Sequence, residues 1–338
     1  GVVLVKSKVG VQPYTAGLRF TASEKLFSLG KGWALEKNRG TIYLGADYAL
    51  SNLDNRQPEQ TFQRMGLQVA YAKDFPSATF RLNFRGYHMQ DKDEKGKNML
   101  NGEYQKTVNQ GLSFSMNGQW NLRKVWITSL EYEAGLTYGY QKNRSSLYYS
   151  GTQQVTTYET EAGEHAGVFL SPNYFSDLSV EGKPLTADAS LIANLRQSIY
   201  NNVYNHFSLG VKAGMEGNHG EGISFNPLAP STEMIGARAR SYRDIPFVHQ
   251  YAAFAEDRLT LRYGGMQTEL QAGIRFNHLQ VKSLHYTPTV EPRFNLRQVL
   301  WEQKEGGVLN SFSIRVGWGL MRKMPDEFLH CGYSLFIV

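Results

Sequence analysis

The side chains best suited to bind a ligand gather in two polar stretches of the chain, residues 143–186 and 217–249. The candidate contacts are Tyr148, Tyr149, Tyr158, Arg238, Arg240 and Tyr242. Tyrosine and arginine side chains can stack on a sugar or a peptide and also hydrogen-bond to it. The same side chains can instead pack the two stretches against each other or anchor them at a membrane interface. Both roles are kept as alternatives to ligand binding.

Covalent chemistry has no comparable signature in the sequence. There is no Gly-x-Ser-x-Gly elbow, no dinucleotide-binding glycine turn and no phosphate-binding loop. The eight histidines are scattered, and none pairs with another His or Cys at a metal-ligand spacing. The single cysteine, Cys331, excludes an internal disulfide. We therefore expect a binding protein rather than an enzyme, without a catalytic residue, a metal or a cofactor.

The segments that must position these side chains alternate apolar and polar residues with a period of two. The clearest case lies between residues 107 and 142, where only Arg123 and Lys124 separate two long segments. Side chains alternate between the faces of a strand, so each segment has an apolar, aromatic-rich face and a polar face. The other candidate strands are residues 12–22, 27–36, 40–50, 63–73, 77–91, 187–200, 206–216, 250–261, 266–281, 291–301 and 308–320.

The connections between these strands alternate between long and short from residue 40 onward. The short ones are residues 74–77, 123–124, 201–205, 262–265 and 302–307, and the long ones are 51–62, 92–106, 143–186, 217–249 and 282–290. Outer-membrane barrels have short periplasmic turns and longer extracellular loops. We therefore expect an all-β, antiparallel transmembrane β-barrel, here a partial barrel of about 12–13 strands. It would form one domain over residues 1–338, with loops 143–186 and 217–249 extracellular and Arg123-Lys124 periplasmic.

Composition agrees with a barrel and excludes other classes. No apolar run reaches the roughly 18 residues that a transmembrane helix needs. Aromatic residues make up 13% of the chain, and the charged residues Arg81, Arg85, Glu131, Glu133, Lys212, Glu269, Arg275 and Arg315 fall on the polar sides of their strands. The net charge of +6 is spread along the chain, so nucleic acid is not an expected partner.

Four strings near the C-terminal end resemble strand motifs of TonB-dependent outer-membrane receptors, with wording most similar to the Bacteroidetes type. They are residues 251–261, 270–277, 291–297 and 313–325, in the order and spacing of that family. The resemblance implies a barrel of about 22 strands filled by a plug. It also implies uptake of a scarce siderophore, cobalamin, oligosaccharide or peptide, with energy supplied through the TonB complex. The implied setting is the bacterial outer membrane, in contact with lipid and lipopolysaccharide.

The chain departs from the family pattern in having no plug-like segment, no TonB box and too few strands. Residues 326–338 do not look like the continuation of such a barrel either. We therefore expect a barrel fragment that lacks the plug and the C-terminal strands, and that meets the TonB complex only through the missing plug region. The alternatives are a passive porin or channel of about 12–14 strands, an outer-membrane enzyme, and a soluble secreted β protein.

Overall fold

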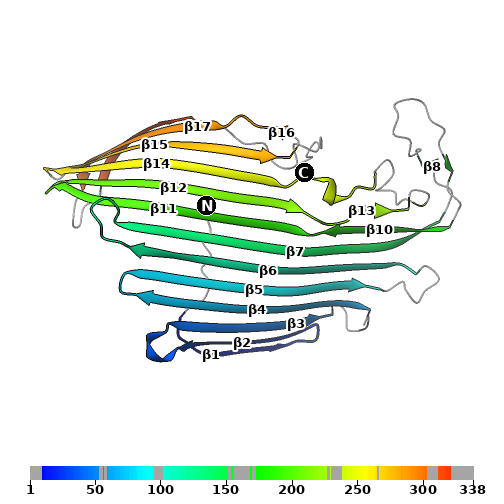
Figure 1. The fold of residues 1–338 in the computed structure, drawn as a ribbon. Coiled ribbons are helices and arrows are strands. Elements are labelled where there is room, and N and C mark those ends of the chain that lie inside the picture. The colour runs from blue at the N-terminus through cyan, green and yellow to red at the C-terminus, as the bar shows by residue number, and fades with distance from the viewer. Residues whose placement is uncertain are drawn as a thin grey trace.

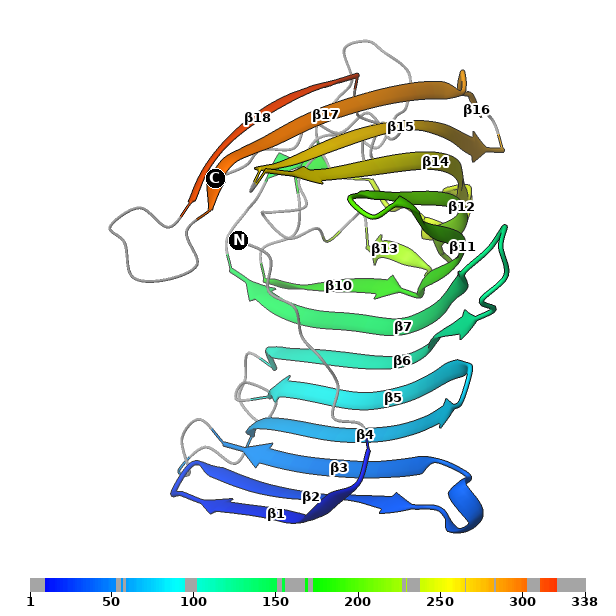
Figure 2. The same cartoon turned by 90° about the vertical axis from the view of Figure 1, so that its left-hand side faces the viewer.

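The computed structural model describes residues 10–52, 56, 59–94, 102–150, 154–155, 168–169, 173–226, 229, 238–264, 266–282, 284–302 and 311–320. In this part of the chain the strands form one curved 16-stranded antiparallel sheet (Figures 1 and 2). No helix in these ranges is long and apolar enough to cross a membrane.

The main path of the sheet contains strands that lie side by side in chain order. They are β1 (Gln12–Phe20), β2 (Glu24–Ala34), β3 (Thr41–Ser51), β4 (Gln60–Phe75), β5 (Ala78–Asp93), β6 (Tyr104–Asn121), β7 (Ser129–Tyr149), β11 (Pro184–Tyr200), β12 (Val203–Asn218), β14 (Val248–Tyr263), β15 (Met266–Val281), β17 (Thr289–Glu302) and β18 (Ser311–Gly319). Each corresponds to one strand that the alternating pattern predicts, so the all-β prediction is confirmed. β1 and β18 end the path on opposite edges, which makes the wall an open, partial barrel (Figure 2).

Shorter elements lie off this path. β10 (Tyr174–Gly182) pairs with β7 and with β13 (Gly222–Phe225), and β16 (Leu284–His285) pairs with β15. β8 (Gln154–Val155) and β9 (Val168–Phe169) form a separate pair. Two 3-10 turns, η1 (Glu36–Asn38) and η3 (Tyr242–Asp244), lie in connections.

The structure corrects three predicted boundaries. The hairpin turn is not Arg123-Lys124 alone, because the Lys124 N–H donates to the Ile127 carbonyl at 2.9 Å and the next strand starts at Ser129. Residues 143–186 are not one loop, since β7 continues to Tyr149 and β10 and β11 occupy 174–182 and 184–200. The stretch 217–249 likewise contains β13. Most of the predicted turn at 302–307 lies outside the described residues.

The two faces of the wall differ in chemistry. One face, here called the apolar face, carries large hydrophobic side chains that are left exposed: Leu44, Leu67, Leu112, Phe114, Leu136, Leu191, Val211, Ile274, Phe294 and Val316. Leu112 is 51% exposed and Leu136 is 46% exposed, and both lie in the middle of long strands. An apolar surface of this extent is not stable in water, so it requires a non-aqueous neighbour.

The opposite, polar face holds cross-strand ion pairs and amide contacts instead of an apolar core. Arg64 of β4 contacts Asp47 of β3 at 3.0 Å, and Arg297 of β17 lies 3.5 Å from Glu269 of β15. Directly opposite residues of neighbouring strands share a face, so the continuous registers of the wall keep the charges on one side. The predicted placement of Glu269 on the polar face is confirmed by its pairing with Arg297, whereas the Arg64–Asp47 pair was not among the predicted charges.

Candidate functional site

At the end of the wall where the long connections emerge, β10 replaces β11 as the neighbour of β7 and forms an extension with it, while β6 still flanks the other side of β7 as far as Ser146. β7 pairs with β11 from Ser129 to Tyr138 and then with β10 from Gln141 to Tyr149. β10 and β11 are nearly one strand, interrupted at Lys183 because Pro184 has no N–H and restricts the residue before it. The Lys183 N–H donates to the Asn218 side chain at 2.7 Å instead. The extension is therefore continuous with the wall through β7 and through the β10–β11 junction at Lys183.

Two aromatic pairs mark the tip of this extension. On the face that continues the polar face, Tyr149 stacks on Tyr174 with ring centroids 5.5 Å apart. On the opposite side, Tyr148 packs against Phe175 at 5.2 Å. Partial burial, reinforced by the neighbouring Tyr149, raises the pKa of the Tyr174 phenol. The Tyr174 hydroxyl consequently stays uncharged at neutral pH, and the stacked pair presents hydroxyls and rings together.

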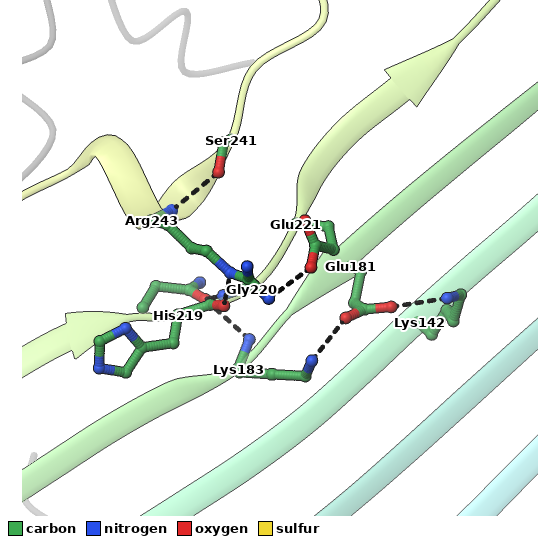
Figure 3. Close-up of polar contacts among 9 residues, drawn as sticks. Lys142, Glu181, Lys183, His219, Gly220, Glu221, Ser241 and Arg243 are labelled. Atoms are coloured by element: carbon green, nitrogen blue, oxygen red, sulfur yellow. Dashed lines mark hydrogen bonds and ion pairs between the residues drawn. The ribbon is translucent and has the colours of Figure 1, made fainter.

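A three-residue ion cluster fixes the base of the extension (Figure 3). Glu181 of β10 is only 6% exposed, and its two carboxylate oxygens accept from Lys142 at 2.6 Å and from Lys183 at 2.8 Å. These hydrogen bonds hold the pKa of the Glu181 carboxyl below its ordinary value, although burial alone acts in the opposite direction. The bond to Glu181 also raises the pKa of Lys183. The cluster lies on the apolar face, beyond Tyr138 and Tyr140. We call the part of this face that carries the large hydrophobic side chains, up to these two tyrosines, the apolar zone.

The stretch 217–249 is tied to the same base. β13 pairs with β10, and Ile223 and Arg240 exchange two backbone hydrogen bonds of 2.8 and 2.9 Å. Arg243 forms an ion pair with Glu221, and its Nε donates to the His219 carbonyl at 3.2 Å (Figure 3). The arginine-bearing segment is therefore held by the backbone and by an ion pair.

Gly222 is the residue on which this attachment depends, and Gly222→Ala tests it. Its φ of +76° is unfavourable for other residues, and a Cβ there would collide with the Arg240 carbonyl. We expect a local loss of about 1–3 kcal/mol. The measurement is limited trypsin digestion, which should cut faster after Arg238, Arg240 and Arg243. The matched control is Gly264→Ala, where φ is also positive but the space is open. Equal cleavage of both variants would contradict the attachment.

The predicted ligand contacts reach the same end of the wall but do not form one cluster. Arg240 lies opposite Ile223, in line with Val180 and Asn143, whereas Tyr149 lies at the tip, six residues beyond Asn143. At roughly 3.3 Å per residue this is about 20 Å along the strand. Tyr242 begins η3, and Arg238 is exposed. Tyr158 lies outside the described residues.

Sequence reasoning missed the residues that build the base. Glu181 and Lys142 are 39 positions apart in the chain, and no local pattern marks them as partners. Arg243 shares the stretch of the predicted arginines, but its role appears only through Glu221. One sequence signal for this base was present: Pro184 indicates a break in the strand at the residue before it, Lys183.

The polar face of β1–β5 is also hollowed. A recess of about 700 Å³ is lined by the Asp47–Arg64 pair, Gln68, Arg85 and Tyr87, among others. Gly66 keeps its floor open, since a Cβ there would collide with the Asp47 carboxylate. A recess lined by charges and hydroxyls suits a polar molecule or a polar protein surface.

Comparison with known protein families identifies the wall. The model of the family described as TonB dependent receptor-like, beta-barrel matches residues 47–320. This chain belongs to that family. No curated protein matches the sequence significantly.

Solved structures with similar walls include receptors that are only distantly related in sequence. BauA, the ferric preacinetobactin receptor from Acinetobacter baumannii, is 8% identical with a TM-score of 0.47, over 88% of this chain and 46% of that one. The ferric-catecholate import receptor Fiu from E. coli K12 in its closed form is 11% identical with a TM-score of 0.45, over 93% and 46%. This TonB-dependent receptor barrel thus spans about half the length of the structures it matches.

One polar network on the polar face of this TonB-dependent receptor barrel resembles catalytic machinery at first sight. The Ser208 Oγ lies 3.3 Å from the His206 Nε2, and the Asn194 Oδ1 lies 3.2 Å from the same nitrogen. The Ser208 hydroxyl, however, donates to Asn194 at 2.8 Å, and Asn194 donates in turn to Glu131. A nucleophile must give its proton to the base while a third group orients the other ring nitrogen. In this network the Ser208 proton goes to Asn194 and not to His206. The family is one of transport receptors rather than enzymes. The network is a set of cross-strand hydrogen bonds that links β7, β11 and β12.

Proposed function

We propose that this chain forms part of the wall of a TonB-dependent outer-membrane receptor, which takes up a scarce ligand with energy passed through the TonB complex. The observation that carries the proposal is the family match over a wall with an exposed apolar face and a charged face. Lipid covers the first face, and the second lines the interior of the barrel. The ligand classes are a siderophore, cobalamin, an oligosaccharide or a peptide.

The proposal includes an orientation. The end with the β7–β10 extension faces the outside of the cell, and the turn around Arg123-Lys124 faces the periplasm. Stretches 143–186 and 217–249 are then extracellular. Support comes from the strands themselves, because β7 has 21 residues and about 9–11 are enough to cross a bilayer. The residues of β7 beyond those needed to cross the bilayer lie at the end where the long connections emerge.

Ligand capture is assigned to this outer end. Tyr149, stacked with Tyr174 on the side of the polar face, is placed to meet a ligand entering the barrel, together with Arg238, Arg240 and Tyr242. Tyr158 remains a candidate because the sequence places it in the polar stretch 143–186. Tyr148 is the weakest candidate, because it packs against Phe175 on the opposite side.

Two finer parts of the proposal rest on the sequence. We assign the receptor to the Bacteroidetes type because the strings at 251–261, 270–277, 291–297 and 313–325 are most similar to that type in wording. Further strands and a plug that contacts the TonB complex belong to the same receptor outside this chain. The unpaired outer edges of β1 and β18 within the described sheet support the additional strands.

The function is tested by uptake into cells that carry the full receptor. The probes are a ferric catecholate, cobalamin, a mixed oligosaccharide pool and a mixed peptide pool, each radiolabelled. We expect saturable uptake of one class, falling to background when TonB is deleted. Uptake that survives the deletion and does not saturate would show a passive channel instead. Activity of the purified receptor on the ligand's covalent bonds would favour an enzyme.

A further inference from the structure

Three cations face one another across the apolar-face side of the extension. Lys92 of β5 lies directly opposite Lys106 of β6, and Lys106 lies directly opposite Arg144 of β7. All three share the face of Tyr138 and Lys142, because each is an even number of residues from a member of that face along a continuous strand. Like charges placed directly opposite each other destabilise a sheet.

None of these three cations forms an ion pair within the part of the chain that the structure describes. The nearby Lys142 is already bound to Glu181, which Lys183 shares. Lys92 and Lys106 are half-buried and Arg144 is exposed, so their charges are held close together beside a wall of low dielectric. The row is suited to an external anion.

Hydroxyl donors continue the same row. Arg144 lies opposite Ser179 of β10, and Ser179 lies opposite Ser224 of β13. A cavity of about 490 Å³ is lined by Arg144 and both serines, with Tyr104 beside them. Its lining also includes Glu181 and Glu221, which are neutralised by lysines and by Arg243, and Asp177. Lysine, arginine and serine all donate hydrogen bonds, and phosphate oxygens accept several at once.

The arrangement of neighbouring charges indicates the direction from which the anion comes. Two acids lie on the side away from the apolar zone: Asp177, two residues from Ser179 along β10, and Glu94, which follows the end of β5. On the side toward the apolar zone the neighbouring positions are Gln90, Val108, Lys142 and Glu181. Glu181 is the acid among them, and it is already bound by Lys142 and Lys183. The field of the row is therefore least opposed toward the membrane, where the exposed Leu112, Leu136 and Tyr138 begin.

We propose that the row Lys92–Lys106–Arg144, continued by Ser179 and Ser224, binds the phosphate groups of a phosphorylated glycolipid in the outer leaflet. This assignment rests on the proposed function, because the outer leaflet lies at this end only if the extension faces outward. The acyl chains of the lipid would lie along the apolar face below Tyr138 and Tyr140. The phosphates would reach the row from the membrane side.

The test uses the full receptor in detergent, with bis-phosphorylated lipid A and its dephosphorylated form as probes and native mass spectrometry as the readout. We expect wild type to bind the phosphorylated form about tenfold more tightly. The combined variant Lys92→Gln, Lys106→Gln and Arg144→Gln should lose this preference. Lys92→Arg, Lys106→Arg and Arg144→Lys should keep it, as should Lys37→Gln, Arg123→Gln and Lys124→Gln, which remove equal charge at the other end.

Two outcomes would overturn the lipid site: no preference in wild type, or an unchanged preference in the glutamine variant. Failure of the underlying orientation is detected separately, with an impermeant maleimide on intact cells carrying Cys331→Ser and Asp177→Cys. Labelling supports an outer-leaflet site. Absence of labelling, in a protein whose phosphate preference persists, would overturn the orientation and the leaflet while leaving the row as a phosphate site.

Discussion

Leu136→Arg is expected to destabilise the wall by about 2–4 kcal/mol, or to prevent its insertion, because in the proposed receptor this side chain faces lipid near the bilayer midplane. Leu136 is 46% exposed and lies opposite Phe114 and Ala187 on the apolar face. In a water-soluble sheet an exposed leucine tolerates arginine at almost no cost. The measurement is urea unfolding of the full receptor in lipid vesicles, with its yield in the outer membrane.

Thr137→Arg is the matched control for this change. Thr137 is the next residue of β7, is exposed and belongs to the polar face. In the proposed receptor the same charge therefore enters the barrel interior at the same depth. We expect normal insertion and a change in unfolding free energy within roughly 0.5 kcal/mol. Equal stability of the two variants would refute the assignment of the apolar face to lipid. A larger loss in Thr137→Arg would mean that the faces are reversed.

Glu181→Gln is expected to have the second large effect, at the base of the extension. The substitution keeps the shape of the side chain but leaves Lys142 and Lys183 as two cations without their shared acid. Removing one partner of a buried ion pair costs up to about 5 kcal/mol, and the partial exposure of both lysines reduces the expected loss to about 2–3 kcal/mol. Hydrogen exchange at the β10 amides would report this loss directly.

The control for Glu181→Gln is Glu221→Gln, which breaks an ion pair in the same region with both partners 55% exposed. An exposed pair contributes at most about 1 kcal/mol, so β10 should exchange almost as in wild type. Comparable acceleration in both variants would contradict the structural role of the buried cluster.

The same cluster predicts how the extension responds to acid. The pKa of the Glu181 carboxyl is lower in the folded state than its ordinary 4.5, so folding favours the ionised form. Its stabilisation is complete above pH 4.5 and is lost as the pH falls through the folded pKa. Wild-type β10 should therefore open in acid, while Glu181→Gln should lack this contribution at every pH. Identical pH profiles of the two proteins would count against it.

The wall was predictable because an apolar face and a polar face impose a period-two pattern on the sequence of its strands. Each strand of the main path has an apolar side and a polar side, and a shift of one residue would reverse them. Alternations such as Leu270, Ala272 and Ile274 against Glu269, Gln271 and Gly273 therefore locate β15 and assign its faces. The short turns could be placed for the same reason, since they separate two alternating segments.

The extension was not predictable because neither of its sides needs to be apolar. β10 reads Tyr174-Phe-Ser-Asp-Leu-Ser-Val-Glu-Gly182, with polar residues on both faces, and β13 has only four residues. These strands are defined by their pairing with β7 and with each other. At Trp126 the pattern predicted a strand where the structure has none. Trp126 continues the alternation but lies in the turn before β7 and is 75% exposed. The ion cluster depends on the same long-range pairing and was missed with it.

The length of β7 has a consequence for what meets the receptor first. Its 21 residues extend for roughly 70 Å, and a tilt near 40° leaves about 50 Å of height. The apolar band of such barrels is about 25 Å tall. In the proposed orientation the tip with Tyr149 and Tyr174 stands about 25 Å above the membrane surface. A molecule diffusing from the medium would then reach that tip well before any lipid.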